Sequence, residues 1–380
     1  MKLGYAVPPE VAQAWDAAVL HDGVNVYASR GGVPGEAAGG PRASPPVLFD
    51  VASLTKPLVV GTLVSLLVKE GAVGLDVPAV EWLPRFTGGG KERVTVRQLL
   101  AHSSGLPWWR PWFEQAMADP VAGRAFLPPV ERPADLTEAF ARGREIVEEA
   151  LWAEPLEAEP GARAVYGDPG YLALGFLLEK AGGAPLDRLF AERVAAKIGL
   201  GDTFFVTAGR LATGQGPCTG RNYAPTERCE HRHEVNQGTV NDDNAWAVGG
   251  VAGHAGLFST ASDVARLGQE WLLAMESHGR ILDPRVAREF ARRDPTPGSE
   301  RALAWDTPSG EASSIGSKLG RGPLGAIGHL GYTGCSLWID RDRRLVCALL
   351  TNHVHPGGRR PAEMLAARRA FHDAVAKAVG

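Results

Sequence analysis

The stretch that decides the fold is Phe49-Asp50-Val51-Ala52-Ser53-Leu54-Thr55-Lys56, which is followed by an almost wholly apolar run over residues 58–69. A helix that is apolar on all sides is a buried helix, so this run predicts a central helix of the core. Pro57 falls in the first turn of that helix, where proline is tolerated. We therefore expect Ser53 at the N-terminal end of a buried helix.

Ser53 and Lys56 are three residues apart, which places both side chains on the same face of a helix. The N-terminal end of a helix carries a partial positive charge and free N–H groups, and both favour a developing oxyanion. A lysine removed from water has a lowered pKa and accepts a proton more readily. The spacing alone is a weak signal, but its position at the start of a buried helix predicts a serine nucleophile that Lys56 assists.

Two further elements belong to this catalytic pattern, namely a tripeptide that begins with Tyr or Ser and a basic-x-Gly segment on a strand. Tyr166-Gly167-Asp168 lies just before an apolar helix expected over residues 171–181. His329-Leu330-Gly331 lies just before a β-rich run that begins near Cys335. Both candidates therefore follow Ser53 in the required order.

Length and charge limit the protein class. The 380 residues, 44% of them hydrophobic, suffice for one large domain or two interleaved lobes. The net charge of −3, with both signs mixed along the chain, does not fit a nucleic-acid-binding protein. The first ten residues contain no apolar run of signal-peptide length, and no apolar run of about 18 residues predicts a membrane span. We expect a cytoplasmic protein, although a chain shortened at its N-terminus would look the same.

The predicted elements are strands near both chain ends and helices in the middle. We expect a helix over residues 9–20, a strand over 24–28, an irregular segment over 108–133, an antiparallel hairpin over 334–340 and 344–351, and a closing helix over 361–379. This order predicts an α/β (α+β) fold in which an antiparallel sheet from both chain ends is flanked by helices. The sheet lobe is placed at residues 1–80 plus 262–380, the inserted helical lobe at 81–261, and the active site between them.

Several phrases together resemble the serine β-lactamase-related family, which includes class C β-lactamases, low-molecular-weight penicillin-binding proteins, family VIII carboxylesterases and D-aminopeptidases. The resemblance covers about residues 48–352. Besides the three motifs above, it rests on Gly74-Leu75-Asp76, Val96-Arg97-Gln98-Leu99-Leu100-Ala101-His102-Ser103-Ser104-Gly105-Leu106-Pro107, Glu159-Pro160-Gly161 and Gly256-Leu257-Phe258-Ser259-Thr260. It implies a β-lactamase/transpeptidase-like fold and a serine hydrolase that works through an acyl-enzyme with no metal and no organic cofactor.

The resemblance also implies roles for individual residues. Ser53 would be acylated by the substrate, while Lys56 and the Tyr166 hydroxyl share the proton transfers. His329 corresponds to the basic residue of the third motif and would help to polarise the site. The backbone N–H groups of Ser53 and of Tyr332, the residue after Gly331 of the third motif, would form the oxyanion hole.

Asp168 and the third motif bear on the substrate. β-Lactamases usually have Asn at the position of Asp168 and Lys-Thr-Gly at His329-Leu330-Gly331, where the Lys and Thr help to hold a carboxylate. Compared with that Lys, His329 is a weaker cation near neutral pH, and unlike that Thr, Leu330 has no hydroxyl to donate. Losing one good donor to a carboxylate costs about 1.5–3 kcal/mol. Asp168 itself either positions Lys56 by charge or only caps the following helix.

We therefore predict a hydrolase of small neutral esters or amides. The alternative is a β-lactamase or a D,D-carboxypeptidase of the penicillin-binding-protein type. A non-catalytic binding protein that keeps the fold is a remote alternative, since such a copy would be expected to have lost Ser53, Lys56 or Tyr166.

Other polar and aromatic residues remain open at this stage. Four tryptophans either line an aromatic acyl pocket or pack in the core, namely Trp108, Trp109, Trp112 and Trp246. His102 and His254 are expected to brace loops, and Asn241-Asp242-Asp243-Asn244 has no assigned role. Cys218 and Cys229 are close enough in sequence to pair, but unpaired thiols are expected. Cys229, His231 and His233 fit no standard zinc spacing, so no metal site is predicted.

Overall fold

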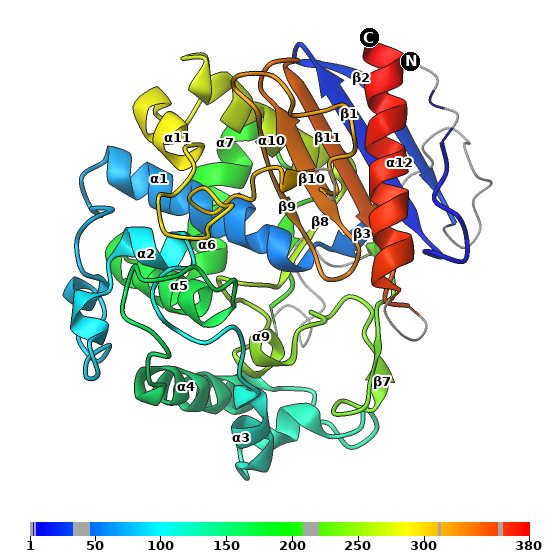
Figure 1. The fold of residues 1–380 in the computed structure, drawn as a ribbon. Helices are drawn as coiled ribbons and strands as arrows, with labels where there is room; N and C mark the ends of the chain where they lie inside the picture. The colour runs from blue at the N-terminus through cyan, green and yellow to red at the C-terminus, as the bar shows by residue number, and fades with distance from the viewer. Residues whose placement is uncertain (1–2, 4, 33–45, 208–219, 311–312, 356–359) are drawn as a thin grey trace.

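Both ends of the chain meet in one sheet. The computed structural model describes residues 3, 5–32, 46–207, 220–310, 313–355 and 360–380. The central sheet is antiparallel throughout and has the order β2-β1-β11-β10-β9. Its strands are β2 (Val24–Gly31), β1 (Trp15–His21), β11 (Leu345–Thr351), β10 (Ser336–Asp340) and β9 (Ala326–Leu330). Since β1 pairs with β11, this sheet confirms the predicted fold class and the predicted hairpin at the end of the chain (Figure 1).

The central sheet is covered on both faces because successive strand residues point to opposite sides. On β11, Val346, Ala348 and Leu350 belong to the main core, which includes helix α10 (Ala261–Met275). Cys347 and Leu349 belong to a second core with helix α12 (Pro361–Val379). The sheet is thus the middle layer between α10 and α12 (Figure 1).

The middle of the chain is mainly helical. Its helices are α1 (Thr62–Lys69), α2 (Val96–Leu100), α3 (Trp112–Ala118), α4 (Thr137–Ala153), α5 (Pro169–Gly182), α6 (Leu186–Phe190), α7 (Ala196–Ile198), α9 (Asp243–Ala247) and α11 (Pro284–Phe290). Short strands form a second sheet of β4 (Phe204–Phe205), β8 (Leu257–Ser259), β3 (Val47–Asp50) and β5 (Asn222–Tyr223), and a hairpin of β6 (Arg228–Cys229) and β7 (Glu234–Val235). The lobe boundaries at residues 80 and 262 stay a prediction.

Two predicted elements are wrong. The expected helix over residues 9–20 is largely replaced by strand β1, because pairing with β11 and β2 outweighs the helical preference of its alanine-rich sequence. The segment 108–133 is not irregular throughout, since it contains α3 and a 3₁₀ turn over Ala122–Phe126. Pro111 stands directly before α3, where its missing N–H breaks no helical hydrogen bond.

The nucleophile segment is a helical rod through the main core. It begins with a 3₁₀ turn (Ala52–Leu54), continues as a π-helical segment (Lys56–Gly61) and ends as α1. The stretch Ala52–Lys69 is long and apolar enough to span a membrane by those two criteria alone, but 83% of it is buried inside the protein. It is therefore the buried core helix that the sequence predicts, with Ser53 at its N-terminal end.

Candidate active site

Ser53 lies in a tight turn between β3 and the buried helix. Its neighbour Ala52 has a φ of 48°, a left-handed conformation that is uncommon for any residue except glycine. The Asp50 carboxylate stabilises this turn by accepting a hydrogen bond of 2.8 Å from the Ala52 backbone N–H. The turn makes Ser53 part of the wall of a cavity.

Lys56 is fully buried beneath Ser53. Its Nζ donates to Ser53 Oγ at 2.8 Å and to Asp168 Oδ1 at 2.7 Å, and lies 3.5 Å from the backbone oxygen of His254. Burial by itself lowers the pKa of the Lys56 ammonium, but attraction to Asp168 and Tyr166 outweighs burial and leaves the pKa above its usual value. Lys56 therefore carries a positive charge at neutral pH.

Asp168 occupies the N-cap position of α5 without capping it, since its side chain accepts no hydrogen bond from the first turn of that helix. It pairs instead with Lys56. Of the two interpretations that the sequence leaves open, the geometry favours the one in which Asp168 acts on Lys56 by charge.

Tyr166 lies beside Lys56 and presents its ring to two cations. Lys56 Nζ is 5.0 Å and the Arg301 guanidinium carbon 4.4 Å from the ring centroid. The His329 ring packs on the same side chain, with 5.8 Å between centroids. The structure thus brings together Ser53, Lys56, Tyr166 and His329 as the sequence predicts, and adds Arg301, whose partner is Asp306.

His329 is buried on β9 and lines the cavity. Its Nδ1 lies 2.8 Å from the Leu330 carbonyl oxygen, to which it must donate, so Nε2 carries a lone pair. Within the described ranges, Nε2 has no hydrogen-bond partner. Burial, followed by the positive charges of Lys56 and Arg301, holds the pKa of His329 well below its usual value. His329 is therefore neutral at pH 7 and supplies no positive charge.

The turn after β9 approaches the nucleophile turn closely. A Cβ at Gly331 would lie 2.5 Å from the Val51 carbonyl oxygen, so only glycine allows this approach. The Thr333 hydroxyl donates to the Asp50 carbonyl oxygen at 2.8 Å. These contacts place Tyr332 next to the turn that holds Ser53.

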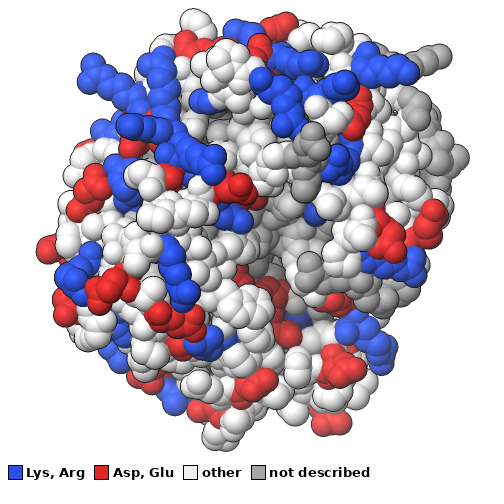
Figure 2. Space-filling model, in the orientation of Figure 1, with Lys and Arg blue, Asp and Glu red and all other residues white. Residues whose placement is uncertain are grey.

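The cavity at this site has a volume of about 720 Å³. Every predicted site residue except Lys56 lines it, and Lys56 lies directly beneath Ser53. Among the described lining residues six are acidic and two are arginines, namely Asp50, Asp168, Glu227, Asp242, Asp243 and Asp306 against Arg301 and Arg368. Figure 2 shows a hollow near the middle of one face with acidic side chains inside it.

The four tryptophans divide between the two interpretations. Trp108 and Trp109 line the cavity, and Trp108 is 62% exposed. Trp112 and Trp246 are buried in the main core. The two tryptophans of the cavity wall therefore come from the segment before α3.

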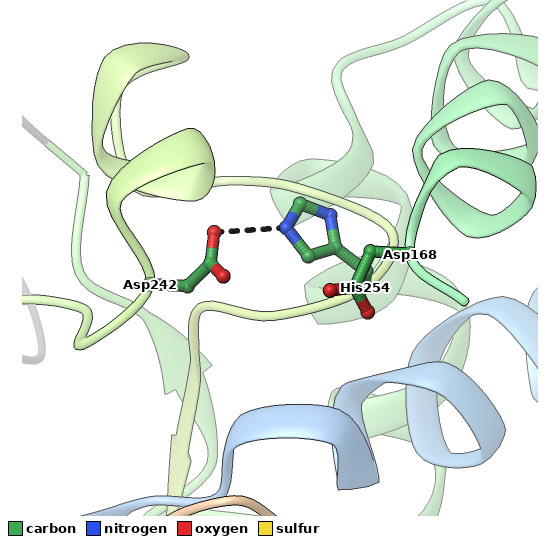
Figure 3. A group of neighbouring side chains, drawn as sticks. All are labelled: Asp168, Asp242 and His254. Carbon is green, nitrogen blue, oxygen red and sulfur yellow. Dashed lines mark hydrogen bonds and ion pairs between the residues drawn. The ribbon is translucent and has the colours of Figure 1, made fainter. Parts of the chain in front are cut away.

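The sequence did not reveal the contact between His254 and Asp242, which line the same cavity. His254 Nε2 lies 2.9 Å from Asp242 Oδ1 (Figure 3). Potential metal-ligating atoms of Asp168, Asp242 and His254 lie within 4.8 Å of one another. The Lys56 ammonium already neutralises Asp168, however, and Asp242 is held by His254, so both carboxylates have partners without an ion.

Cys229 belongs both to the possible disulfide and to the group with His231 and His233 considered from the sequence. A Cys218–Cys229 disulfide involves Cys218, which lies outside the described residues. Cys229 Sγ lies 3.4 Å from Asp243 Oδ1 and 3.4 Å from Arg232 Nε, while the His231 ring packs on Phe113.

Comparison with known proteins identifies relatives over nearly the whole chain. The family model described as Beta-lactamase matches residues 10–371. A Salmonella paratyphi A protein, whose name of D-alanyl-D-alanine carboxypeptidase is provisional, is 28% identical over 83% of this chain and 71% of its own.

Solved structures share the fold. EstCE1, described as a hydrolase with promiscuous acyltransferase activity, has a TM-score of 0.65 at 20% identity over 95% of this chain and 94% of its own. An octameric penicillin-binding protein homologue from Pyrococcus abyssi has a TM-score of 0.63 at 20% identity over 94% of this chain and 73% of its own.

Proposed function

The chain belongs to the beta-lactamase family of serine hydrolases, and we propose that it is an esterase-like member that forms an acyl-enzyme on Ser53. The observation that carries this proposal is the 2.8 Å hydrogen bond between Lys56 Nζ and Ser53 Oγ at the wall of a cavity. A serine hydroxyl needs an adjacent proton acceptor to become a nucleophile. A buried lysine in contact with the hydroxyl meets that need once it has lost a proton.

In the proposed reaction, Ser53 Oγ attacks the carbonyl carbon of an ester. The hydroxyl proton passes to the pair formed by Lys56 and Tyr166 and is returned to the leaving alcohol as the ester bond breaks. A water molecule then attacks the acyl-enzyme, releases the acid and restores Ser53. The backbone N–H groups of Ser53 and Tyr332 are proposed to hold the negative oxygen in both tetrahedral steps.

The charge of the cavity supports a neutral substrate. Acidic residues outnumber arginines in the wall, and His329 is neutral at pH 7. A substrate carboxylate would meet net repulsion there, and the third motif offers it neither a cation nor a hydroxyl. Trp108 and Trp109 provide an apolar surface for an acyl or alcohol group.

A second candidate function is D,D-carboxypeptidase activity. The observation that favours it is the name of the Salmonella relative, at 28% identity. This function needs a bound D-alanine carboxylate, which the acidic wall disfavours. Stable labelling by a fluorescent penicillin together with release of D-alanine from a D-Ala-D-Ala peptide would establish it in place of the esterase.

Turnover of short p-nitrophenyl esters tests the proposed function. The wild type should hydrolyse at least one ester of the panel, and Ser53→Ala should abolish this activity, because the substitution removes the hydroxyl that Lys56 Nζ contacts at 2.8 Å. Intact-mass analysis should find the acyl group on the wild type, and a peptide map should place it on Ser53. A wild type without turnover of any ester, or equal turnover by the variant, would refute the proposal.

A further inference from the structure

The polar run Asn241-Asp242-Asp243-Asn244, which has no role assigned from the sequence, connects the walls of the cavity. Asp242 contacts His254, and Asp243 contacts the buried Arg232 at 3.0 Å. Asn244 accepts from the Phe113 N–H and donates to the Arg110 carbonyl oxygen. Asn241 joins the turn that holds Ser53 to the turn that holds Tyr332.

Asn241 is bound on one side to the nucleophile turn. Its backbone N–H donates to Asp50 Oδ2 at 2.6 Å. The other oxygen of the same carboxylate holds the Ala52 N–H, one residue before Ser53. Asp50 therefore links the strained turn at Ala52 directly to Asn241.

Asn241 is bound on the other side to Glu227, whose carboxylate reaches Tyr332. Asn241 Nδ2 donates to Glu227 Oε2 at 2.9 Å, and Asn241 Oδ1 accepts from the Glu227 backbone N–H at 3.2 Å. The Tyr332 hydroxyl donates to Glu227 Oε1 at 3.0 Å. Arg232, fully buried, fixes the backbone of this segment by donating to the Asn241 carbonyl oxygen at 2.9 Å.

A chain of hydrogen bonds thus runs from Ala52 through Asp50, Asn241 and Glu227 to Tyr332. We propose that Asn241 and Glu227 are positioning residues that hold the Ser53 and Tyr332 turns at a fixed separation, and so align the two backbone N–H donors of the oxyanion hole. This inference rests on the proposed function. Both donors of such a hole must lie about 2.7–3.1 Å from the oxyanion. A small change in the separation of the two turns therefore reduces stabilisation of the transition state more than it reduces substrate binding.

The clamp acts on the exposed side of the Tyr332 turn. Tyr332 is 43% exposed, whereas Gly331 and Thr333 beside it contact the nucleophile turn. On the buried side, Arg368 also holds this turn by donating to the carbonyl oxygens of Gly331 and Gly334. The bond from Glu227 to the Tyr332 hydroxyl restrains the exposed side.

Tyr332→Phe, Glu227→Gln and the double variant test the clamp, with kcat and KM measured on an ester that the wild type hydrolyses. Tyr332→Phe keeps the backbone N–H and removes only the hydroxyl, and Glu227→Gln keeps the side-chain size. Gln237→Ala is the matched control. This side chain donates to the Tyr223 carbonyl oxygen at 2.9 Å in the same loop region, and among the described residues it has no hydrogen bond to either turn.

Each single variant should lower kcat about tenfold while KM changes less than about twofold, since misaligned donors affect the transition state. The double variant should lose no more kcat than the single variant with the larger loss, because both changes affect the same chain of bonds. The midpoint of thermal unfolding should shift by less than about 3 °C, which distinguishes positioning from a structural role. Gln237→Ala should leave kcat unchanged.

Unchanged kcat in both single variants, or losses that multiply in the double variant, would overturn the clamp. So would losses of kcat that follow losses of thermal stability. These outcomes leave the Ser53-dependent activity of the wild type intact. A wild type that hydrolyses no ester overturns the proposed function instead, and the clamp with it, so the two failures are distinguishable.

Discussion

Replacing Asp168 with asparagine tests whether the proton on Lys56 limits acylation. The Asp168 carboxylate lies 2.7 Å from Lys56 Nζ and contributes to the raised pKa of this ammonium. Asparagine keeps the size of the side chain and one acceptor for the Lys56 hydrogen bond, but removes the negative charge. The substitution should therefore lower the pKa of Lys56 while leaving its position largely unchanged.

The size of this shift follows from the geometry. An opposite charge at such a distance changes a pKa by about 1–3 units, which corresponds to about 1.4–4 kcal/mol. Coulomb's law at an effective dielectric constant of about 20 gives a ceiling of about 6 kcal/mol for charges 2.7 Å apart. The Asp168 side chain is 24% exposed, so solvent screening keeps the shift below that ceiling.

The pH dependence of kcat/KM for an ester is the assay. Activity should rise with pH as Lys56 loses its proton, and Asp168→Asn should move this rising limb to lower pH by about 1–3 units. Asp243→Asn is the matched control, since it removes a carboxylate of the same cavity that pairs with Arg232. A limb that stays in place, or moves to higher pH, would refute the argument that Asp168 sets the charge of Lys56.

Two further predictions concern Asp50 and Trp108. Burial raises the pKa of Asp50 from 3.8 to about 6, so the folded protein favours the protonated carboxyl. This contribution to stability is fully present below the ordinary pKa of 3.8 and is lost, by about 3 kcal/mol, as the pH rises through the folded-state pKa of about 6. In urea unfolding, the stability of the wild type relative to Asp50→Asn should fall by about this amount between about pH 4 and about pH 7, and a constant difference would contradict the assignment. Trp108→Ala should raise KM for aryl esters about threefold to tenfold, with little change in thermal stability because Trp108 is already 62% exposed. An unchanged KM would show that Trp108 is not part of the substrate surface.

The parts of the fold that the sequence predicts are those with strong local patterns. A local pattern of apolar residues marks the buried helix after Ser53, the hairpin of β10 and β11, and helix α12. The sequence predicts a helix where strand β1 lies, because this segment is held extended between the adjacent β2 and β11, and β11 lies more than 300 residues away. Local propensity carries no information about such a partner.

The same limit applies to the candidate site. Ser53, Lys56, Tyr166 and His329 stand in short motifs, so their order along the chain predicted them together. Arg301 and the contact of His254 with Asp242 have no such motif. The His254 carbonyl oxygen reaches Lys56 across 198 residues, and Asn241 reaches Asp50 across 191. Only the folded chain shows these contacts.

The two departures from the usual motifs are physically connected. Asp168 favours a protonated Lys56, and the positive charges of Lys56 and Arg301 then disfavour a further cation at His329. A lysine in the third motif would stand as a third positive charge in a buried site, at a high electrostatic cost. Burial and these two neighbouring cations make a residue that can stay neutral the compatible choice for that position. The charge on Lys56 lies under Ser53, fully buried, and is already paired with Asp168. It therefore offers a substrate carboxylate little of the attraction that a lysine of the third motif would provide, which is why the change at Asp168 and the preference for neutral substrates belong together.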